Sequence, residues 1–153
     1  MTREGSHKLI TKFVGTRGVQ EYRESIDEWI DASDDVLELG CEWGTTTTVI
    51  AERARSVIGT DISAKCINRA REIYPEIRFE VLDAYDVLGA QRLGANCNKI
   101  YMDLSGFSGY RSLLDVIALL NTYASVLEPS AIVIKSGALK QFASHSVSWR
   151  ANS

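Results

Sequence analysis

Cysteine and histidine are scarce in this sequence. Three cysteines, Cys41, Cys66 and Cys97, occur among 153 residues, and they are widely spaced as well as odd in number. This pattern indicates neither a disulfide framework nor a zinc cluster, so we expect reduced, packed thiols. The two histidines, His7 and His145, lie near the ends of the sequence and lack the spacing of metal ligands.

Long hydrophobic runs and an excess of positive charge are missing too. No uninterrupted apolar stretch approaches the ~20 residues that span a bilayer, and the first residues contain no apolar signal region. We therefore expect a soluble, cytoplasmic protein that has no membrane partner. The formal net charge of −3 counts against strong autonomous binding of nucleic acid but leaves room for a local basic patch.

What the sequence does contain is a regular alternation of strand-like and helix-like segments. With 45% hydrophobic residues among 153, it can bury one substantial core. We expect one domain over residues 1–153, in which residues 1–18 are a flexible or substrate-side segment. The predicted strands are 36–39, 57–60, 77–82, 99–102 and 131–135, and the predicted helices are 19–32, 45–55, 63–73, 85–93, 110–127 and 137–147. This order predicts an α/β fold with a doubly wound, mostly parallel sheet.

The most informative motif is the run DDVLELGCEWGTTT, which the run VIGTD follows. The first apolar segment ends in Glu38, enters a turn at Gly40 and Gly44, and opens into a helix at Thr45. The second apolar segment ends in Asp61. Glycines let the backbone approach a ligand closely, and an acid that closes the second strand can accept the hydroxyls of a ribose. The motif therefore predicts a nucleotide-cofactor site.

These residues resemble the class I S-adenosylmethionine-dependent methyltransferases over roughly residues 19–146. The resemblance implies a Rossmann-like sheet and S-adenosyl-L-methionine as the cofactor. It also implies that Asp61 binds the ribose, that Asp83 contacts the adenine amino group and that the amide of Ala84 faces the ring. The full set of cofactor-binding residues implied in this way is Glu38, Gly40, Glu42, Gly44, Thr45, Asp61, Ile62, Asp83, Ala84 and Asp103.

One residue departs from the family pattern, because Glu42 stands where the middle glycine of the turn is usual. Its side chain narrows the approach of the methionine moiety and adds negative charge near a sulfonium. A dinucleotide pyrophosphate needs the close approach of glycine and is repelled by a carboxylate, so Glu42 weakens the rival interpretation as a nicotinamide enzyme more strongly. We favour the methyltransferase interpretation and keep the dinucleotide enzyme as an alternative.

Two charged residues close the fourth and fifth predicted strands. Asp103 ends one strand at the edge where ligands bind in open α/β sheets, and Lys135 ends a buried strand, where a lysine needs a partner. We expect the two side chains to lie near each other. The pair resembles that of the fibrillarin and FtsJ types of 2′-O-ribose RNA methyltransferase, which implies an RNA acceptor and a further early lysine. Lys8 is the best candidate for that lysine, and Lys12 is the substitute.

The resemblance to catechol-type enzymes that hold a divalent ion is poorer. Those enzymes carry an Asp-Asn pair after the fifth strand, where this sequence has Lys135 and Ser136. We therefore expect no metal at the site.

The sequence after Lys135 runs only to residue 153. This is too short for the helix and antiparallel hairpin that complete full class I domains, so we expect the hairpin to be missing. The fifth predicted strand would then be a sheet edge that needs cover from the last helix, a homodimer partner, another subunit or a missing segment. This ending and Glu42 also favour an alternative function, a non-catalytic methyltransferase-like subunit that acts as a binding or scaffold partner.

Overall fold

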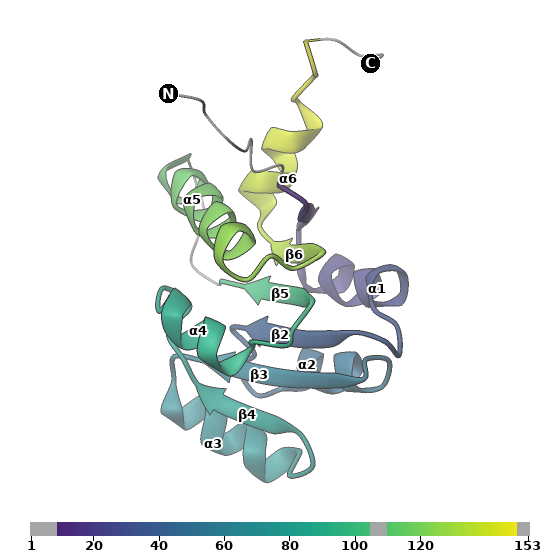
Figure 1. The fold of residues 1–153 in the computed structure, drawn as a ribbon, viewed down its shortest axis with the longest axis vertical. Coiled ribbons are helices and arrows are strands. Elements are labelled where there is room, and N and C mark those ends of the chain that lie inside the picture. Colours follow the sequence, from purple (N-terminus) through teal and green to yellow (C-terminus); the bar gives the residue numbers. More distant parts are fainter. Residues whose placement is uncertain (1–8, 105–109, 150–153) are drawn as a thin grey trace, which may run out of the picture.

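The computed structural model describes residues 9–104 and 110–149, apart from the side chains of residues 110 and 111 (Figure 1). Within these ranges six strands form one sheet in the order β1-β6-β5-β2-β3-β4, and every neighbouring pair is parallel. The strands are β1 (Lys12–Thr16), β2 (Asp35–Leu39), β3 (Ser56–Asp61), β4 (Arg78–Val81), β5 (Lys99–Asp103) and β6 (Ala131–Lys135). The helices are α1 (Val19–Trp29), α2 (Thr45–Ala51), α3 (Ala64–Ile73), α4 (Val87–Leu93), α5 (Tyr110–Val126) and α6 (Gly137–Ser144). The predicted doubly wound α/β fold is confirmed.

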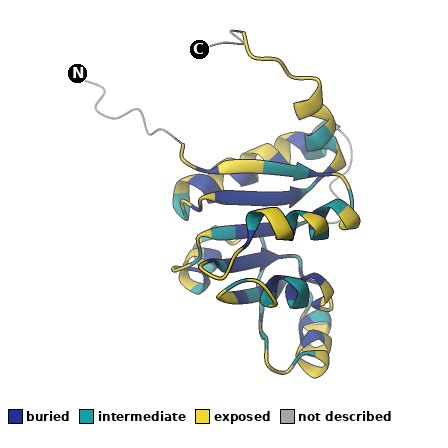
Figure 2. Cartoon of the chain, turned by 90° about the vertical axis from the view of Figure 1, so that its right-hand side faces the viewer, coloured by how far each residue is buried: buried dark blue, intermediate teal, exposed yellow. Residues whose placement is uncertain are grey.

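The middle of the sheet is covered on both faces, which explains why its strands are almost entirely apolar. On one face, Leu37 of β2 and Ile100 of β5 pack in a cluster with helices α4 and α5. On the other face, Val36 and Tyr101 pack with helices α1 and α2. Figure 2 shows the resulting burial, with dark strands inside and exposed residues on the outer sides of the helices.

Strand β1 was not predicted, and it corrects two expectations. It pairs in parallel with β6, from Lys12 opposite Ala131 to Thr16 opposite Lys135. The prediction that the fifth strand of the pattern, β6, forms a sheet edge is therefore wrong, because β1 occupies that position. Of the two alternatives for residues 1–18, a flexible segment is likewise wrong for residues 12–16, whereas a substrate-side segment stays a prediction.

Side-chain hydrogen bonds anchor β1 at both ends. The hydroxyl of Thr11 donates to the carbonyl oxygen of Pro129 at 2.6 Å, and that of Thr16 donates to the carbonyl oxygen of Ile134 at 3.0 Å. The pattern of the strand gave little signal, because its first two residues are exposed and Gly15 interrupts the apolar run. An edge strand that is covered by neighbours on one side only does not need a continuous apolar sequence.

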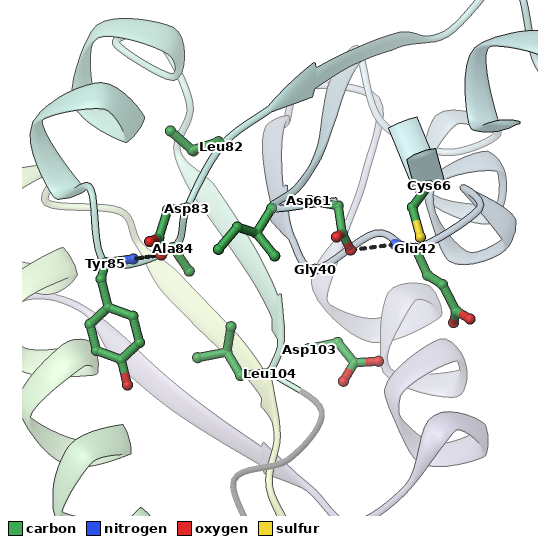
Figure 3. A pocket seen from close by; sticks show the side chains of 11 residues that line it. Gly40, Glu42, Asp61, Cys66, Leu82, Asp83, Ala84, Tyr85, Asp103 and Leu104 are labelled. Atoms are coloured by element: carbon green, nitrogen blue, oxygen red, sulfur yellow. Dashed lines mark hydrogen bonds between the residues drawn. The ribbon is translucent and has the colours of Figure 1, made fainter. Parts of the chain in front are cut away.

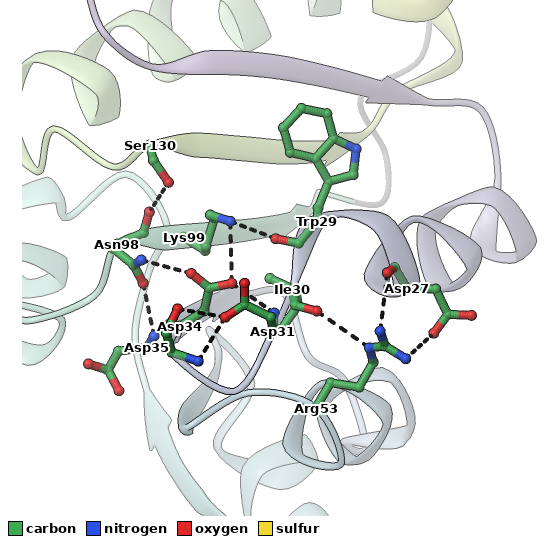
Figure 4. Close-up of polar contacts among 11 residues, drawn as sticks. Asp27, Trp29, Ile30, Asp31, Asp34, Asp35, Arg53, Asn98, Lys99 and Ser130 are labelled. Atoms are coloured by element: carbon green, nitrogen blue, oxygen red, sulfur yellow. Dashed lines mark hydrogen bonds and ion pairs between the residues drawn. The ribbon is translucent and has the colours of Figure 1, made fainter.

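Several helices end earlier than predicted, and α1 shows the reason. It ends at Trp29 rather than residue 32, since the carboxylate of Asp31 accepts hydrogen bonds from the amide and hydroxyl of Ser33, and that of Asp34 accepts one from the amide of Asp31 (Figure 4). Such local bonds offer the backbone a turn in place of a further helical residue.

The same region holds a partly buried polar cluster at the amino ends of β2 and β5. Lys99 lies between Asp34, whose carboxylate is 3.3 Å from its Nζ, and the carbonyl oxygen of Trp29 at 2.6 Å. Asn98 donates to Asp34 at 2.8 Å and accepts from the amide of Asp35 at 2.9 Å (Figure 4). The cluster fixes β2 and β5 relative to each other at their amino ends. The cavities described next lie at the carboxyl ends of the strands.

Candidate functional site

The carboxyl ends of the strands surround a cavity of about 540 Å³ (Figure 3). This volume lies within the range of about 300–1,000 Å³ that is typical of small-molecule sites. The residues that line it are Gly40, Glu42, Asp61, Ile62, Cys66, Leu82, Asp83, Ala84, Tyr85, Asp103 and Leu104. The set includes most of the residues predicted to bind the cofactor.

A second cavity, of about 290 Å³, adjoins the first. Both cavities are lined by Gly40, Glu42 and Asp103, so these three residues stand at the junction. The other residues around the second cavity are Val19, Arg23, Glu38, Cys41, Trp43, Thr45, Thr46 and Lys135. The two cavities together form an elongated site with a mostly apolar arm and a charged arm.

The glycine turn between β2 and α2 runs through left-handed backbone conformations. The φ angles are 82° at Gly40, 51° at Glu42 and 85° at Gly44. A Cβ at Gly40 would lie 1.9 Å from the carbonyl oxygen of Asp103, so this glycine is required for contact with β5 as well as for an open ligand site. Glu42 adopts a conformation that suits glycine, which is consistent with its place in the motif.

Two backbone amides hold the carboxylate of Asp61 at the end of β3. One oxygen accepts from the amide of Glu42 at 3.0 Å (Figure 3). The other accepts from the amide of Ser63 at 2.9 Å. Each carboxylate oxygen has a second acceptor position, so Asp61 can still accept hydroxyl groups of a ribose. Its position fits the predicted role.

The apolar arm has a polar rim that follows β4. The carboxylate of Asp83 accepts from the amide of Tyr85 at 2.9 Å, and the carbonyl oxygen of Ala84 accepts from the hydroxyl of Tyr123 at 2.7 Å. Around this loop lie Ile62, which is 67% exposed, and Leu104. A planar aromatic ring would find apolar side chains for its faces here and polar groups for its edge.

Glu38 lies at the base of the charged arm and is only 1% exposed. Its burial raises the pKa of the carboxyl group to about 8, although the hydroxyl of Thr47 donates to it and favours the charged form. The negative charge of Asp103 raises this pKa further, whereas the guanidinium of Arg23 lowers it. A cationic ligand group beside Glu38 would favour the ionised form of this carboxyl group and lower its pKa.

Asp103 and Lys135 are direct neighbours in the register of β5 and β6, as predicted. The Nζ of Lys135 lies 2.9 Å from a carboxylate oxygen of Asp103, and the two side chains are 24% and 18% exposed. Because Asp103 lines both cavities, the pair lies at their junction. A partly desolvated amine held in one orientation is suited to position a reacting hydroxyl group.

The structure describes only one of the two candidates for the early lysine. Lys8 lies outside the described residues. Lys12 begins β1 opposite Ala131, at the amino ends of the strands. Lys135 lies four strand positions further on, at the carboxyl ends, so the two lysines are roughly 13 Å apart along the strands. The substitute role of Lys12 is therefore wrong.

Sequence reasoning missed the contribution of α1 to the site. Val19 and Arg23 of this helix line the charged arm, and the Nε of Arg23 donates to the hydroxyl of Thr46 at 3.0 Å. An amphipathic helical pattern does not tell whether a polar side chain such as Arg23 meets solvent or a cavity. Trp43, which is 55% exposed, also lines this arm.

The described part of the chain contains no group of three or more histidine, cysteine or acidic side chains arranged to hold a metal ion. In residues 9–104 and 110–149, none of the helices has the length and apolar character that crossing a bilayer requires. The expected absence of a metal stays a prediction.

Comparison with known proteins identifies related sequences and folds. Residues 36–130 match the family described as Methyltransferase domain. An rRNA methylase from Streptococcus thermophilus has a similar structure, with a TM-score of 0.57 and 12% sequence identity over 86% of this chain and 81% of that one. A TehB-like SAM-dependent methyltransferase from Corynebacterium glutamicum gives a TM-score of 0.55 and 21% identity over 76% of this chain and 62% of that one.

A fibrillarin/Nop5p complex also contains a similar chain. The TM-score is 0.50 and the identity 21%, and the match covers 63% of this chain and 46% of that one. This chain therefore spans about half the length of that relative. At such identities the likeness concerns the fold.

Proposed function

Because the chain belongs to the class I S-adenosylmethionine-dependent methyltransferase family, we propose that it transfers a methyl group from S-adenosyl-L-methionine to a hydroxyl acceptor, an RNA ribose 2′-hydroxyl. The observation that carries this proposal is the ion pair of Lys135 with Asp103, because Asp103 lines both arms of the site.

The residues present fit this cofactor. Asp61 presents acceptor oxygens for ribose hydroxyls, and the rim of Asp83 and Ala84 suits an adenine edge. In the charged arm, Glu38 and Thr45 would hold the amino-acid end. When bound, S-adenosylmethionine supplies an electrophilic methyl group on a sulfonium.

Lys135 and Asp103 act on the acceptor in this proposal. A ribose hydroxyl is a weak acid and a poor nucleophile, so it has to be oriented and its proton has to be removed or stabilised. Lys135 in its deprotonated form would accept the proton of the hydroxyl group as the oxygen takes the methyl group and the sulfonium leaves as a neutral thioether, and Asp103 would stabilise the ammonium that results. An acceptor nitrogen with a free lone pair would need less help, which is why the pair favours a hydroxyl acceptor.

A non-catalytic subunit that binds partners through the same fold is the second candidate. Glu42 supports it, since this side chain lines both arms at a position that glycine usually keeps clear. We propose that a homodimer partner or a second subunit extends the sheet by pairing with β1, which is the edge strand beside β6 in the described sheet.

The cytoplasmic location also stays a prediction.

The first experiment is a calorimetric titration of S-adenosylmethionine and S-adenosylhomocysteine into the purified chain, with NAD as the rival ligand. Saturable binding that the Asp61→Ala variant loses would support the cofactor site. Binding of NAD alone would contradict it. Transfer of a labelled methyl group to RNA, but not to the matching 2′-deoxy strand, would then support the ribose acceptor. Binding without transfer to any acceptor would favour the non-catalytic subunit.

A further inference from the structure

Helix α1 brings one arginine side chain across the glycine turn. Arg23 is half-buried, lines the charged arm, and donates from Nε to the hydroxyl of Thr46 in α2 at 3.0 Å. The helix is firmly placed, because the adjacent Tyr22 is fully buried and its ring packs edge-to-face on Tyr101 with 5.1 Å between centroids. Arg23 precedes the residues 36–130 that match the family, so the match assigns it no role.

The charges around this arm leave Arg23 without an ion pair. Lys135 is paired with Asp103, and the nearby Glu21 is paired with Arg17 and Lys140. Among the ion pairs formed by described residues, none includes Arg23. Its guanidinium can therefore still form a two-pronged contact with an anionic group in the cavity.

The anionic group that fits is the carboxylate of an amino acid. Glu38, the buried acid at the base of the arm, suits an ammonium group, and Arg23 acts electrostatically on Glu38 from α1. An acid and a guanidinium that line one cavity match the two charges of the methionine end of the cofactor. The Thr46 hydroxyl, which accepts from Arg23, holds the guanidinium in position.

We propose that Arg23 binds the carboxylate of the methionine end of the cofactor, which makes α1 part of the cofactor site. This inference rests on the proposed function, because it takes S-adenosylmethionine as the ligand. It adds a specificity element: the site would bind adenosine derivatives that lack the amino-acid end more weakly than those that carry it. Through the same contact between the guanidinium and the carboxylate, the bound cofactor would help to hold α1 in place.

The test compares two neutral-sulfur ligands, S-adenosylhomocysteine and 5′-methylthioadenosine, which lacks the amino-acid end. Their affinities are measured by calorimetry for the wild type, Arg23→Met and Arg23→Lys. We expect Arg23→Met to weaken S-adenosylhomocysteine about 10- to 100-fold, the effect of losing a charge-assisted contact, and to leave 5′-methylthioadenosine unchanged. Arg23→Lys, which keeps the charge but not the fork, should give an intermediate loss. Arg92→Met, at an exposed arginine in the last turn of α4, is the control for the loss of one charge.

The two ligands separate a binding role from a folding role. Retained binding of 5′-methylthioadenosine shows that the variant is folded. Equal losses for both ligands, or no loss for either, would overturn the role of Arg23 while leaving the cofactor assignment intact. A wild-type chain that binds neither ligand would overturn the cofactor assignment, and the inference would fall with it.

Discussion

Gly40 and Asp103 are so close that a Cβ on residue 40 would lie 1.9 Å from the carbonyl oxygen of Asp103. The backbone of the glycine turn therefore contacts the end of β5 directly, at the residue that carries the proposed catalytic carboxylate. Any side chain at residue 40 would displace that strand end.

Gly40→Ala tests this contact. We expect the free energy of unfolding to fall by roughly 2–5 kcal/mol, because overpacking and a left-handed alanine both add cost. Urea denaturation of the variant measures the change. Gly18→Ala is the control, since no atom lies within 4 Å of its Cβ position, and it should change the stability by less than about 1 kcal/mol. Similar losses for both variants would contradict the importance of the contact.

Asp103→Asn and Lys135→Met test the catalytic pair. Each should lower kcat about 10²- to 10⁴-fold, the usual contribution of a positioned proton-transfer group, and leave the affinity for S-adenosylhomocysteine within a few-fold. Turnover is followed by transfer of labelled methyl groups, once an acceptor is known. Lys140→Met removes a lysine from a different ion pair, with Glu21, and should leave kcat unchanged. Undiminished turnover in the pair variants would rule out the proposed roles.

The raised pKa of Glu38 predicts that the free energy of unfolding depends on pH. Its pKa is about 8 in the folded chain and near 4.5 when unfolded. The unfolded state therefore loses the proton first, so the contribution of Glu38 is fully present below about pH 4.5 and is lost as the pH rises toward 8.

Urea denaturation at several pH values between 5 and 8 should show this decline, with a slope of at most about 1.4 kcal/mol per pH unit. Glu38→Gln, which keeps the shape and removes the titration, should flatten the curve. If the wild type and Glu38→Gln have parallel profiles, the carboxyl group does not carry a raised pKa.

Glu42→Gln tests the charge at the junction of the two arms. S-adenosylmethionine carries a sulfonium and S-adenosylhomocysteine a neutral sulfur, so a nearby carboxylate favours the former. Removing this exposed charge should lower the ratio of the two affinities about 2- to 5-fold, and less at high salt. Calorimetry with both ligands gives the ratio. An unchanged ratio would place the carboxylate away from the sulfur.

Asp34→Ala tests the partly buried polar cluster at the amino ends of β2 and β5. The variant leaves the amine of Lys99, which is 16% exposed, with the carbonyl oxygen of Trp29 but without its carboxylate, so we expect a loss of about 1–3 kcal/mol of stability. Adding Lys99→Met should recover part of the loss. Cofactor affinity should stay the same in the folded variants, because the cluster lies away from both cavities; a matching loss of affinity would disprove this separation.

The central strands and the strand-end acids were predictable because each signal is local. Strands β2 and β5 are short apolar runs, and Glu38, Asp61 and Asp103 are the last or the last but one residues of their strands. Parallel pairing brings those ends to one edge of the sheet. Simple spacing was therefore enough to predict the pair of Asp103 and Lys135.

The features that sequence reasoning missed depend on contacts between distant segments. Strand β1 is stabilised by pairing with β6 and by hydrogen bonds from Thr11 and Thr16, none of which a local pattern records. Arg23 reaches the site only because α1 packs beside α2. The end of α1 was set by aspartate side chains that compete for backbone amides, which periodicity does not describe.

The pairing of β1 with β6 sets an order of events during folding. The hydrogen bonds of Thr11 and Thr16 join residues that are 118 positions apart in the chain. During synthesis, β1 therefore leaves the ribosome long before its strand partner β6 exists. Closing so long a loop is slow compared with forming neighbouring β-α-β units, so β1 should dock last and complete the sheet after the other five strands.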